Sequence, residues 1–264
     1  MRRGAFVSTA NAIDRGLSAE LVADLAAAAF TLARRFAAGA TMWSIAPSLE
    51  PHALHIAVEF VHPVIMGKRA LPAVALTGPD LVDLARVSVR PGDIVVAVSG
   101  ADQPEVRSVL RRSPAWGATT IWIGSGERPK AGAAEHVLWL DDPDPQVPAT
   151  GGFVLFYHLL WELTHVCFEH AGLLKPECAE PVCVTCSDEG RLGEVMTPAV
   201  DGLAPIRTAR GIENVVTTLI EPVKSGDLVL VHAGTALARV DDEDPGIAGI
   251  AGAAPSSRVV EEDE

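Results

Sequence analysis

Three of the four cysteines lie close together in the sequence, and one histidine follows them on a short apolar segment. Cys178, Cys183 and Cys186 fall within nine residues in the pattern C-x4-C-x2-C. His232 ends the apolar run LVLVH and precedes a glycine-containing turn. Thiolate sulfur and imidazole nitrogen are both strong ligands for transition metals. These residue types predict a metal site or a reactive thiol if the fold brings Cys183, Cys186 and His232 together.

The cysteine pattern does not complete any closed cluster site. It opens like the plant-type iron–sulfur signature, but no fourth cysteine follows Cys186. A structural zinc site would need a second C-x-x-C, and a thioredoxin-like C-x-x-C would open a helix in a βαβ unit. A pair of ordinary thiols beside a linker is the simple alternative. Because the cysteines are not spread out as a disulfide framework, we expect a reducing, cytoplasmic environment.

A second group of candidate ligands lies on one predicted helix. The segment EPHALHIAVEFVH carries His52, His55, Glu59 and His62 at spacings of three, four and three. These spacings place all four side chains on one helical face. Imidazole and carboxylate groups together suit zinc or acid–base chemistry. A solvated polar face is the simpler alternative.

The first part of the chain alternates helix and strand patterns. Short apolar runs bounded by turn residues, such as LPAVALTG and GDIVVAVSG, indicate buried strands. Longer segments with helical spacing, such as LVADLAAAAFTLARRFAAG after the N-cap residue Ser18, indicate helices. For residues 1–174 this alternation predicts an α/β domain with a parallel five-stranded sheet flanked by helices.

The pattern changes after a short segment that two prolines bracket. Pro176 and Pro181 indicate an acidic linker at 175–182. From 183 to 241 the sequence shows short strand patterns with glycine and proline turns, which predict a small antiparallel, OB-like β-barrel. We predict that 242–264 is an acidic disordered tail.

Charge and hydropathy exclude several classes of function. The net charge of −13 disfavours nucleic-acid binding, because phosphates require lysine and arginine partners. The longest apolar stretch, LVADLAAAAFTLA, is too short and too interrupted to span a membrane. The paired arginines of MRRGAF are followed by Asp14 and Glu20 rather than by a long apolar core, so no targeting segment is predicted. We therefore expect a cytoplasmic protein that binds neither nucleic acid nor membrane.

Residues 15–174 resemble a sugar isomerase (SIS) domain of the phosphoheptose isomerase type. The resemblance rests on the leading helix and then, in order, on HIAVEF, RALPAVAL, PGDIVVAVSG and HLLWELTHVCFE. It implies that His55, Glu59 and His165 line the active site, with Glu59 and His165 catalytic if isomerase activity is retained. In some members these groups bind zinc together with a glutamine, whose position here is Tyr157. The resemblance also implies a homo-oligomer formed through the helices.

The phosphate-binding segments depart from that family's pattern. SIAPSLEP stands in place of a glycine-asparagine-glycine-glycine-serine loop, and SGADQPEV stands in place of a turn rich in serine and threonine. Ser99 is the one hydroxyl kept in that turn, and with His55 it is a candidate ligand-binding residue. Asp102 and Glu105 add negative charge near the place of a phosphate, which itself carries about two charges. These departures favour a ligand-binding or dimerising domain over an active isomerase.

Residues 183–241 resemble the HypC/HupF proteins, which are small chaperones of hydrogenase maturation. The resemblance is carried by an opening cysteine and by VKSGDLVLVHAGTALARV, in which GDLVLVHAG is the most specific part. It implies that Cys183 and His232 bind iron transiently as an Fe(CN)2CO-type fragment, with Cys186 as an alternative or auxiliary thiol. The partners implied are HypD and the hydrogenase large-subunit precursor.

The sequence thus leaves two functions open. One is an accessory chaperone in nickel–iron hydrogenase maturation, which carries iron on the barrel and uses a degenerate SIS domain for ligand binding or dimerisation. The other is a sugar-phosphate isomerase, similar to sedoheptulose 7-phosphate isomerases, or a sugar-phosphate sensor. A plain scaffold, in which the SIS half dimerises two barrels, is a third interpretation.

Overall fold

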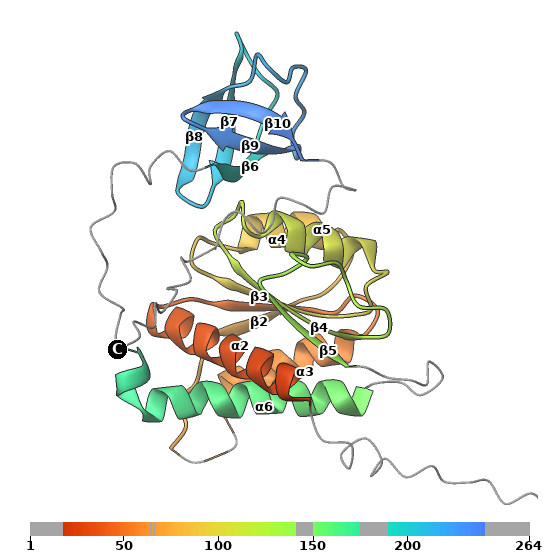
Figure 1. Cartoon of the computed structure of the whole chain (residues 1–264), viewed down its shortest axis with the longest axis vertical. Helices are drawn as coiled ribbons and strands as arrows, with labels where there is room; N and C mark the ends of the chain where they lie inside the picture. The colour runs from red at the N-terminus through yellow and green to blue at the C-terminus, as the bar shows by residue number, and fades with distance from the viewer. Residues whose placement is uncertain (1–17, 64, 66, 141–149, 175–189, 241–264) are drawn as a thin grey trace, which may run out of the picture.

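The computed structural model describes residues 18–63, 65, 67–140, 150–174 and 190–240. The predicted linker at 175–182 and the predicted tail at 242–264 lie outside the described residues. Figure 1 shows a layered α/β domain with a barrel of strands beside it. Within the described part of the chain, no helix combines the length and the apolar character needed to cross a membrane.

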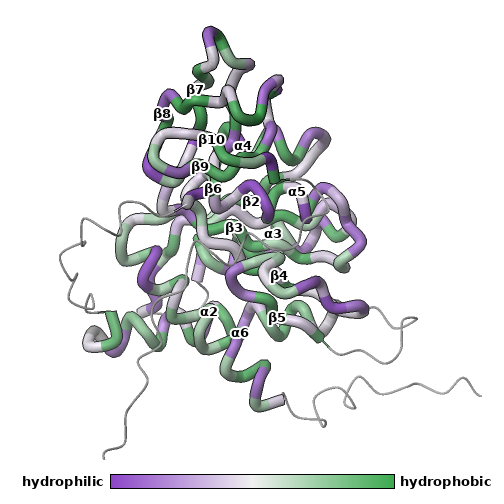
Figure 2. Tube along the Cα trace, turned by 45° about the horizontal axis from the view of Figure 1, so that its top comes forward, coloured by the Kyte–Doolittle hydropathy of each residue, from purple (hydrophilic) through white to green (hydrophobic). Residues whose placement is uncertain are grey.

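The first domain is built on a sheet of five parallel strands in the order β2-β1-β3-β4-β5. All five residues of β3 are buried, as expected for the central strand of a sheet covered on both faces. Figure 2 shows the hydrophobic character of these central strands. The predicted parallel five-stranded α/β sheet is therefore confirmed. The strands are β1 (Met42–Ile45), β2 (Ala73–Leu76), β3 (Ile94–Val98), β4 (Thr119–Ser125) and β5 (His136–Leu140).

Helices cover both faces of this sheet. One face is covered by α2 (Ala19–Ala37), α3 (Glu50–Val61) and α6 (Thr150–Glu169), and the 3-10 turn η1 (Ala171–Leu174) follows α6. The other face is covered by α4 (Leu81–Ser88) and α5 (Pro104–Arg112). Helix α2 begins as predicted, because the Ser18 hydroxyl accepts a hydrogen bond from the Leu21 N–H at 3.1 Å. The helices α3 and α6 are in contact, and this contact positions the site described below.

The second part of the chain forms a closed barrel of five strands in the order β10-β8-β7-β6-β9. Four of the five neighbour contacts are antiparallel, but β10 runs parallel to β8, so the predicted antiparallel barrel is corrected to a mixed one. The reason is topological, because a closed ring with an odd number of strands cannot alternate direction at every contact. The OB-like assignment stays a prediction. The strands are β6 (Arg191–Val195), β7 (Leu203–Thr208), β8 (Gly211–Val216), β9 (Leu228–His232) and β10 (Thr235–Arg239).

A buried glutamate joins the barrel to the first domain. Glu194 of β6 is 0% exposed and accepts hydrogen bonds from Arg86 Nε at 3.0 Å and from Trp116 Nε1 at 2.6 Å. Arg207 of β7 donates to the main-chain oxygens of Arg86 and Val89 at 2.5 and 2.6 Å. The carboxylate is thus removed from water but paired and hydrogen-bonded, which is the condition under which a buried charge is tolerated.

Apolar side chains of both halves pack together beside this ion pair. Leu228 and Val240 of the barrel belong to the same buried cluster as Leu110 and Trp116 of the first domain, and Leu192 packs against that cluster. The barrel and the α4–α5 face therefore share one apolar core. Figure 1 shows the barrel on the side of the sheet that α4 and α5 cover.

We expect Glu194→Ala to lower the free energy of unfolding by about 1–3 kcal/mol, because the change leaves the buried Trp116 Nε1–H without its acceptor and removes one of the two carboxylate partners of Arg86. Urea unfolding followed by circular dichroism measures the loss. Glu127→Ala is the matched control, since Glu127 is exposed, and its effect should stay within about 0.5 kcal/mol. Equal effects of the two substitutions would contradict the assigned role of Glu194.

Candidate functional site

Two histidines and one glutamate converge where α3 contacts α6. His55 Nε2 lies 3.4 Å from His158 Nε2 and 4.0 Å from Glu59 Oε2, and His158 Nε2 lies 3.9 Å from the same carboxylate oxygen. His55 and Glu59 are one helical turn apart on α3, and His158 comes from α6. We call His55, Glu59 and His158 the histidine–glutamate triangle.

The donor atoms of the triangle fit a divalent metal ion. In a tetrahedral zinc site with bonds of about 2.0–2.1 Å, neighbouring ligand atoms lie about 3.3 Å apart. The observed separations of 3.4, 3.9 and 4.0 Å require only a small contraction to reach that value. The imidazoles of His55 and His158 are 43% and 44% exposed, so a fourth position is open to water or a ligand. Three protein ligands and one open position are typical of a catalytic or ligand-binding zinc site.

Tyr157 supports the triangle from the protein interior. Its hydroxyl oxygen lies 2.9 Å from Nδ1 of His55 and 3.4 Å from Nδ1 of His52. Burial, together with the negative charge of Glu59, raises the pKa of Tyr157 to about 12. Burial, and to a smaller extent the neighbouring His55, lowers the pKa of His52 below its usual value. Tyr157 is therefore a neutral phenol at physiological pH, and protonation of His52 is disfavoured.

The structure brings together only part of the predicted polar face of α3. His55 and Glu59 lie in the triangle, whereas His52 is buried behind Tyr157 and His62 is exposed at the end of the helix. His158 was not among the predicted ligands. Helical spacing relates residues within one helix, and His158 reaches the triangle only through the contact between two helices.

His165 lies apart from the triangle, although the family resemblance groups it with His55 and Glu59. It is buried, with Nδ1 2.9 Å from the carbonyl oxygen of Trp161 and Nε2 3.0 Å from that of Arg69. Both ring nitrogens thus face main-chain carbonyl oxygens, and a neutral ring donates its single N–H to one of the two. In this structure His158 takes the place that the sequence analysis gave to His165 among possible zinc ligands.

Ser99 is engaged in the core of the sheet. It is buried at the end of β3, and its hydroxyl accepts a hydrogen bond from Trp122 Nε1 at 3.0 Å. A side chain at Gly124 would come within 2.4 Å of the Ser99 carbonyl oxygen and 2.2 Å of the Trp139 ring, so only glycine fits there. The role of Ser99 as a ligand-binding residue stays a prediction.

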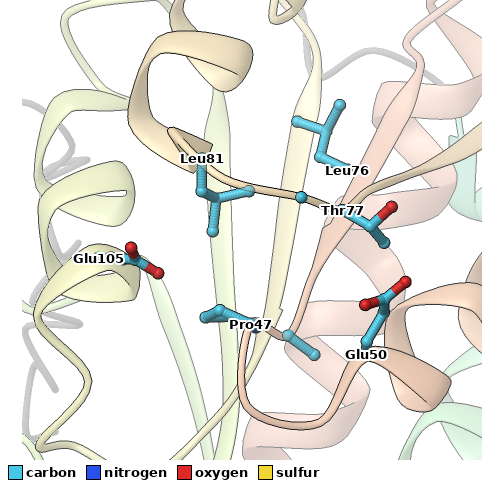
Figure 3. Close-up of a pocket in the computed structure, with 8 residues that line it drawn as sticks. Pro47, Glu50, Leu76, Thr77, Leu81 and Glu105 are labelled. Atoms are coloured by element: carbon cyan, nitrogen blue, oxygen red, sulfur yellow. The ribbon is translucent and has the colours of Figure 1, made fainter.

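A shallow cavity of about 210 Å³ lies at the carboxyl ends of β1 and β2. Glu50, at the start of α3, and Glu105, at the start of α5, line it from opposite sides (Figure 3). No lysine or arginine is among its lining residues, so a phosphate placed there would meet carboxylates without a compensating cation. The lining residues are Ala46, Pro47, Glu50, Leu76, Thr77, Gly78, Leu81 and Glu105.

The predicted thiol ligands lie outside the described residues. This holds for Cys183 and Cys186, and also for the neighbouring Cys178, whereas Cys167 is a free, buried thiol on α6. His232 is described and ends β9 at the turn into β10. The convergence of Cys183 and His232 therefore stays a prediction.

No family model and no curated protein sequence matches the chain. Among solved structures, a phosphoheptose isomerase from Francisella tularensis superposes with a TM-score of 0.51 at 15% identity, and the match covers 61% of this chain and 94% of that one. The first domain has the phosphoheptose isomerase fold. Two further matches have lower scores. Phosphoheptose isomerase GmhA from Neisseria gonorrhoeae has a TM-score of 0.49 at 17% identity, covering 59% and 93% of the two chains. The sugar isomerase domain of an RpiR transcription factor from Sphaerobacter thermophilus has a TM-score of 0.46 at 16% identity, covering 63% and 93%.

Tyr157 is the only tyrosine in the chain, so its ionisation can be read directly from ultraviolet absorbance. A free tyrosine, with a pKa of about 10, is more than half ionised at about pH 10.5. The folded protein should show almost no phenolate absorbance at that pH, because burial raises the pKa of Tyr157 to about 12. A folded-state pKa above the unfolded value stabilises the fold below pH 10, and that contribution is lost as the pH rises further.

The urea-unfolded chain is the control for this titration and should ionise normally. Glu59→Gln should lower the pKa of Tyr157 somewhat, because the carboxylate charge is the second cause of the shift. Full phenolate absorbance of the folded protein at about pH 10.5 would show that the Tyr157 hydroxyl is not buried against the triangle.

Proposed function

We propose that the first domain binds a sugar-type ligand at a divalent metal ion, zinc by its ligand chemistry, held by His55, Glu59 and His158. The observation that carries this proposal is the histidine–glutamate triangle, whose donor atoms lie 3.4–4.0 Å apart with one side open. The phosphoheptose isomerase fold supports a sugar-type ligand. A zinc ion there would polarise a hydroxyl or carbonyl oxygen. The protein's part is to hold three ligands on two packed helices and leave the fourth position accessible.

Within this proposal, a binding or sensing role is favoured over phosphosugar isomerisation. An isomerase of this kind must hold the phosphate as well as the reacting carbons. At the carboxyl edge of the sheet, the cavity is lined by Glu50 and Glu105 and by no cation. A phosphate of about two negative charges would be repelled there. A sugar without a phosphate avoids that repulsion, and we therefore expect the ligand to be recognised mainly through its hydroxyl groups.

Zinc titration of the full chain by isothermal calorimetry tests the metal site. Wild type should bind one zinc ion per chain through the triangle, and His158→Ala should weaken the affinity by about 100-fold or more, because it removes a direct ligand. His62→Ala is the matched control, since His62 is an exposed histidine at the end of α3, outside the triangle. Equal affinities of wild type and His158→Ala would reject the site.

The same zinc-loaded protein can then be screened by thermal shift against sugars and their phosphates. A bound ligand raises the free energy of unfolding by an amount that depends on its concentration relative to Kd. At about 100 times Kd the increase is about 2.7 kcal/mol. We expect a stabilising unphosphorylated sugar, no larger shift from its phosphate, and loss of the shift in Glu59→Gln. A shift given by the phosphate alone would instead favour the phosphosugar isomerase or sensor.

A second function, for the barrel, is favoured by the position of His232. Strand β6 pairs with β9 so that Arg191 lies opposite Val231, the residue before His232. The chain therefore enters the barrel beside His232 directly after the cysteine segment. Cys186 is four residues before Gly190, and a chain of that length spans at most about 14 Å. Cys183 is seven residues before Gly190, a reach of at most about 25 Å.

We propose on this ground that the barrel carries an Fe(CN)2CO-type iron fragment in nickel–iron hydrogenase maturation, with Cys183 and His232 as its protein ligands and Cys186 as an auxiliary thiol. A thiolate is a soft, strong ligand for such iron. A site with only one or two protein ligands can release its cargo, which a closed four-ligand site does not. The partners would be HypD and the hydrogenase large-subunit precursor.

The combined substitution Cys183→Ala and Cys186→Ala tests this second function in hydrogenase-expressing cells. We expect loss of hydrogenase maturation and loss of the infrared bands of bound cyanide and carbon monoxide from the purified protein, because both candidate thiol ligands are gone. Cys178→Ala is the control, since it removes a nearby thiol outside this pair. Full maturation in the double variant would rule out the carrier role.

A further inference from the structure

Tyr157 connects two histidines through one hydroxyl group. Its oxygen lies 2.9 Å from Nδ1 of His55 and 3.4 Å from Nδ1 of His52. A phenol has a single proton to donate, and a neutral imidazole carries its proton on only one of its two nitrogens. The hydroxyl can therefore donate to one histidine while it accepts from the other. Two arrangements of the same atoms follow, and they differ in where His55 carries its proton.

In the first arrangement, Tyr157 donates to His52 and accepts the Nδ1–H of His55. The Nε2 lone pair of His55 then faces Glu59 and His158, as metal binding requires. In the second arrangement, Tyr157 donates to Nδ1 of His55, whose proton then lies on Nε2. That N–H points toward His158 Nε2, 3.4 Å away, and forms an imidazole–imidazole hydrogen bond that occupies the metal position.

The surroundings of Tyr157 and His52 hold this connection in place. Tyr157 is fully buried, and His52 is 6% exposed, so water does not compete freely for either group. The His52 ring packs edge-on against Phe153 and Tyr157, with centroids 5.7 and 5.9 Å apart, and His55 packs edge-on against Tyr157 at 5.1 Å. This packing restrains the rings, so the two arrangements differ in the positions of the hydroxyl and imidazole protons rather than in the positions of the rings.

We propose that Tyr157 acts as a hydrogen-bond switch between His55 and His52, and that metal binding sets this switch with the proton of His55 on Nδ1 and the hydroxyl of Tyr157 turned toward His52. This inference rests on the proposed metal site. When the second arrangement changes to the first, the Nδ1 proton of His52 passes to the Tyr157 oxygen and the Tyr157 hydroxyl proton passes to Nδ1 of His55. His55 releases its Nε2 proton to water and His52 takes up a proton at Nε2, so the total number of protons is unchanged. Tyr157 and His52 are positioning residues, because neither binds the metal.

Zinc affinity tests the switch in the full chain. Tyr157→Phe keeps the buried ring and removes the hydroxyl, and we expect it to lower zinc affinity by about 10–100-fold, as is usual for partners behind a metal ligand. His52→Phe leaves the hydroxyl with only His55 to donate to, so it should favour the second arrangement and lower the affinity similarly. The two changes combined should cost no more than Tyr157→Phe alone, because His52 acts only through Tyr157. Additive losses would indicate general damage and overturn the proposal.

Nitrogen-15 NMR of the histidine rings tests the switch without zinc, at about pH 8, where histidines are ordinarily neutral. In the wild type, one of His52 and His55 should carry its proton on Nδ1, and in Tyr157→Phe neither should, because neither keeps a partner there. Added zinc should place the Nδ1 proton on His55. If both rings keep their wild-type protonation in Tyr157→Phe, the switch is wrong even if zinc binds. If wild type binds no zinc but one of the two rings carries its proton on Nδ1 only when the Tyr157 hydroxyl is present, the hydrogen-bond connection holds and the metal site fails.

Discussion

The contact between α3 and α6 is the constraint on which the candidate site depends. Two helices that cover the same face of a parallel sheet bring His158 within 4 Å of His55 and Glu59, although about one hundred residues separate them in the chain. Tyr157 occupies the buried side of the same contact and touches His55 and His52 at once. The site is therefore assembled by core packing rather than by a loop, and rigid elements hold ligands more precisely than loops do.

The barrel is attached to the opposite face of the sheet. Helices α4 and α5 lie between the sheet and the barrel, and the fully buried Glu194 pairs there with the half-buried Arg86. The histidine–glutamate triangle and His232 thus belong to different layers of one protein, separated by the sheet. This separation fits two distinct binding functions better than one composite site.

Local sequence patterns predict the sheet and its helices but only part of the site. The apolar run IVVAV predicts the buried strand β3, and the N-cap residue Ser18 predicts the start of α2. Both predictions depend only on neighbouring residues, and the structure confirms both elements. His55 and Glu59 are related by one helical turn, so their proximity is also a local property. His158 reaches them through the packing of two helices, which no single-helix period encodes. His165 shares the face of α6 but is engaged by main-chain carbonyls.

Local sequence patterns also predict only part of the barrel. Short strands and glycine turns indicate its strands, yet the parallel contact between β8 and β10 follows from closing a ring of five strands, not from any strand by itself. Glu194, in the strand RLGEV, resembles an ordinary solvent-facing glutamate in the sequence. Its burial depends on Arg86 and Trp116, which lie far away in the chain.

X-ray absorption at the zinc edge of the metal-loaded full chain tests the central claim most directly, because it reports the atoms bound to the metal. The account predicts one zinc ion with two imidazole nitrogens and carboxylate or water oxygens at about 2.0–2.2 Å, and one imidazole fewer in His158→Ala. A spectrum that His158→Ala leaves unchanged would contradict it.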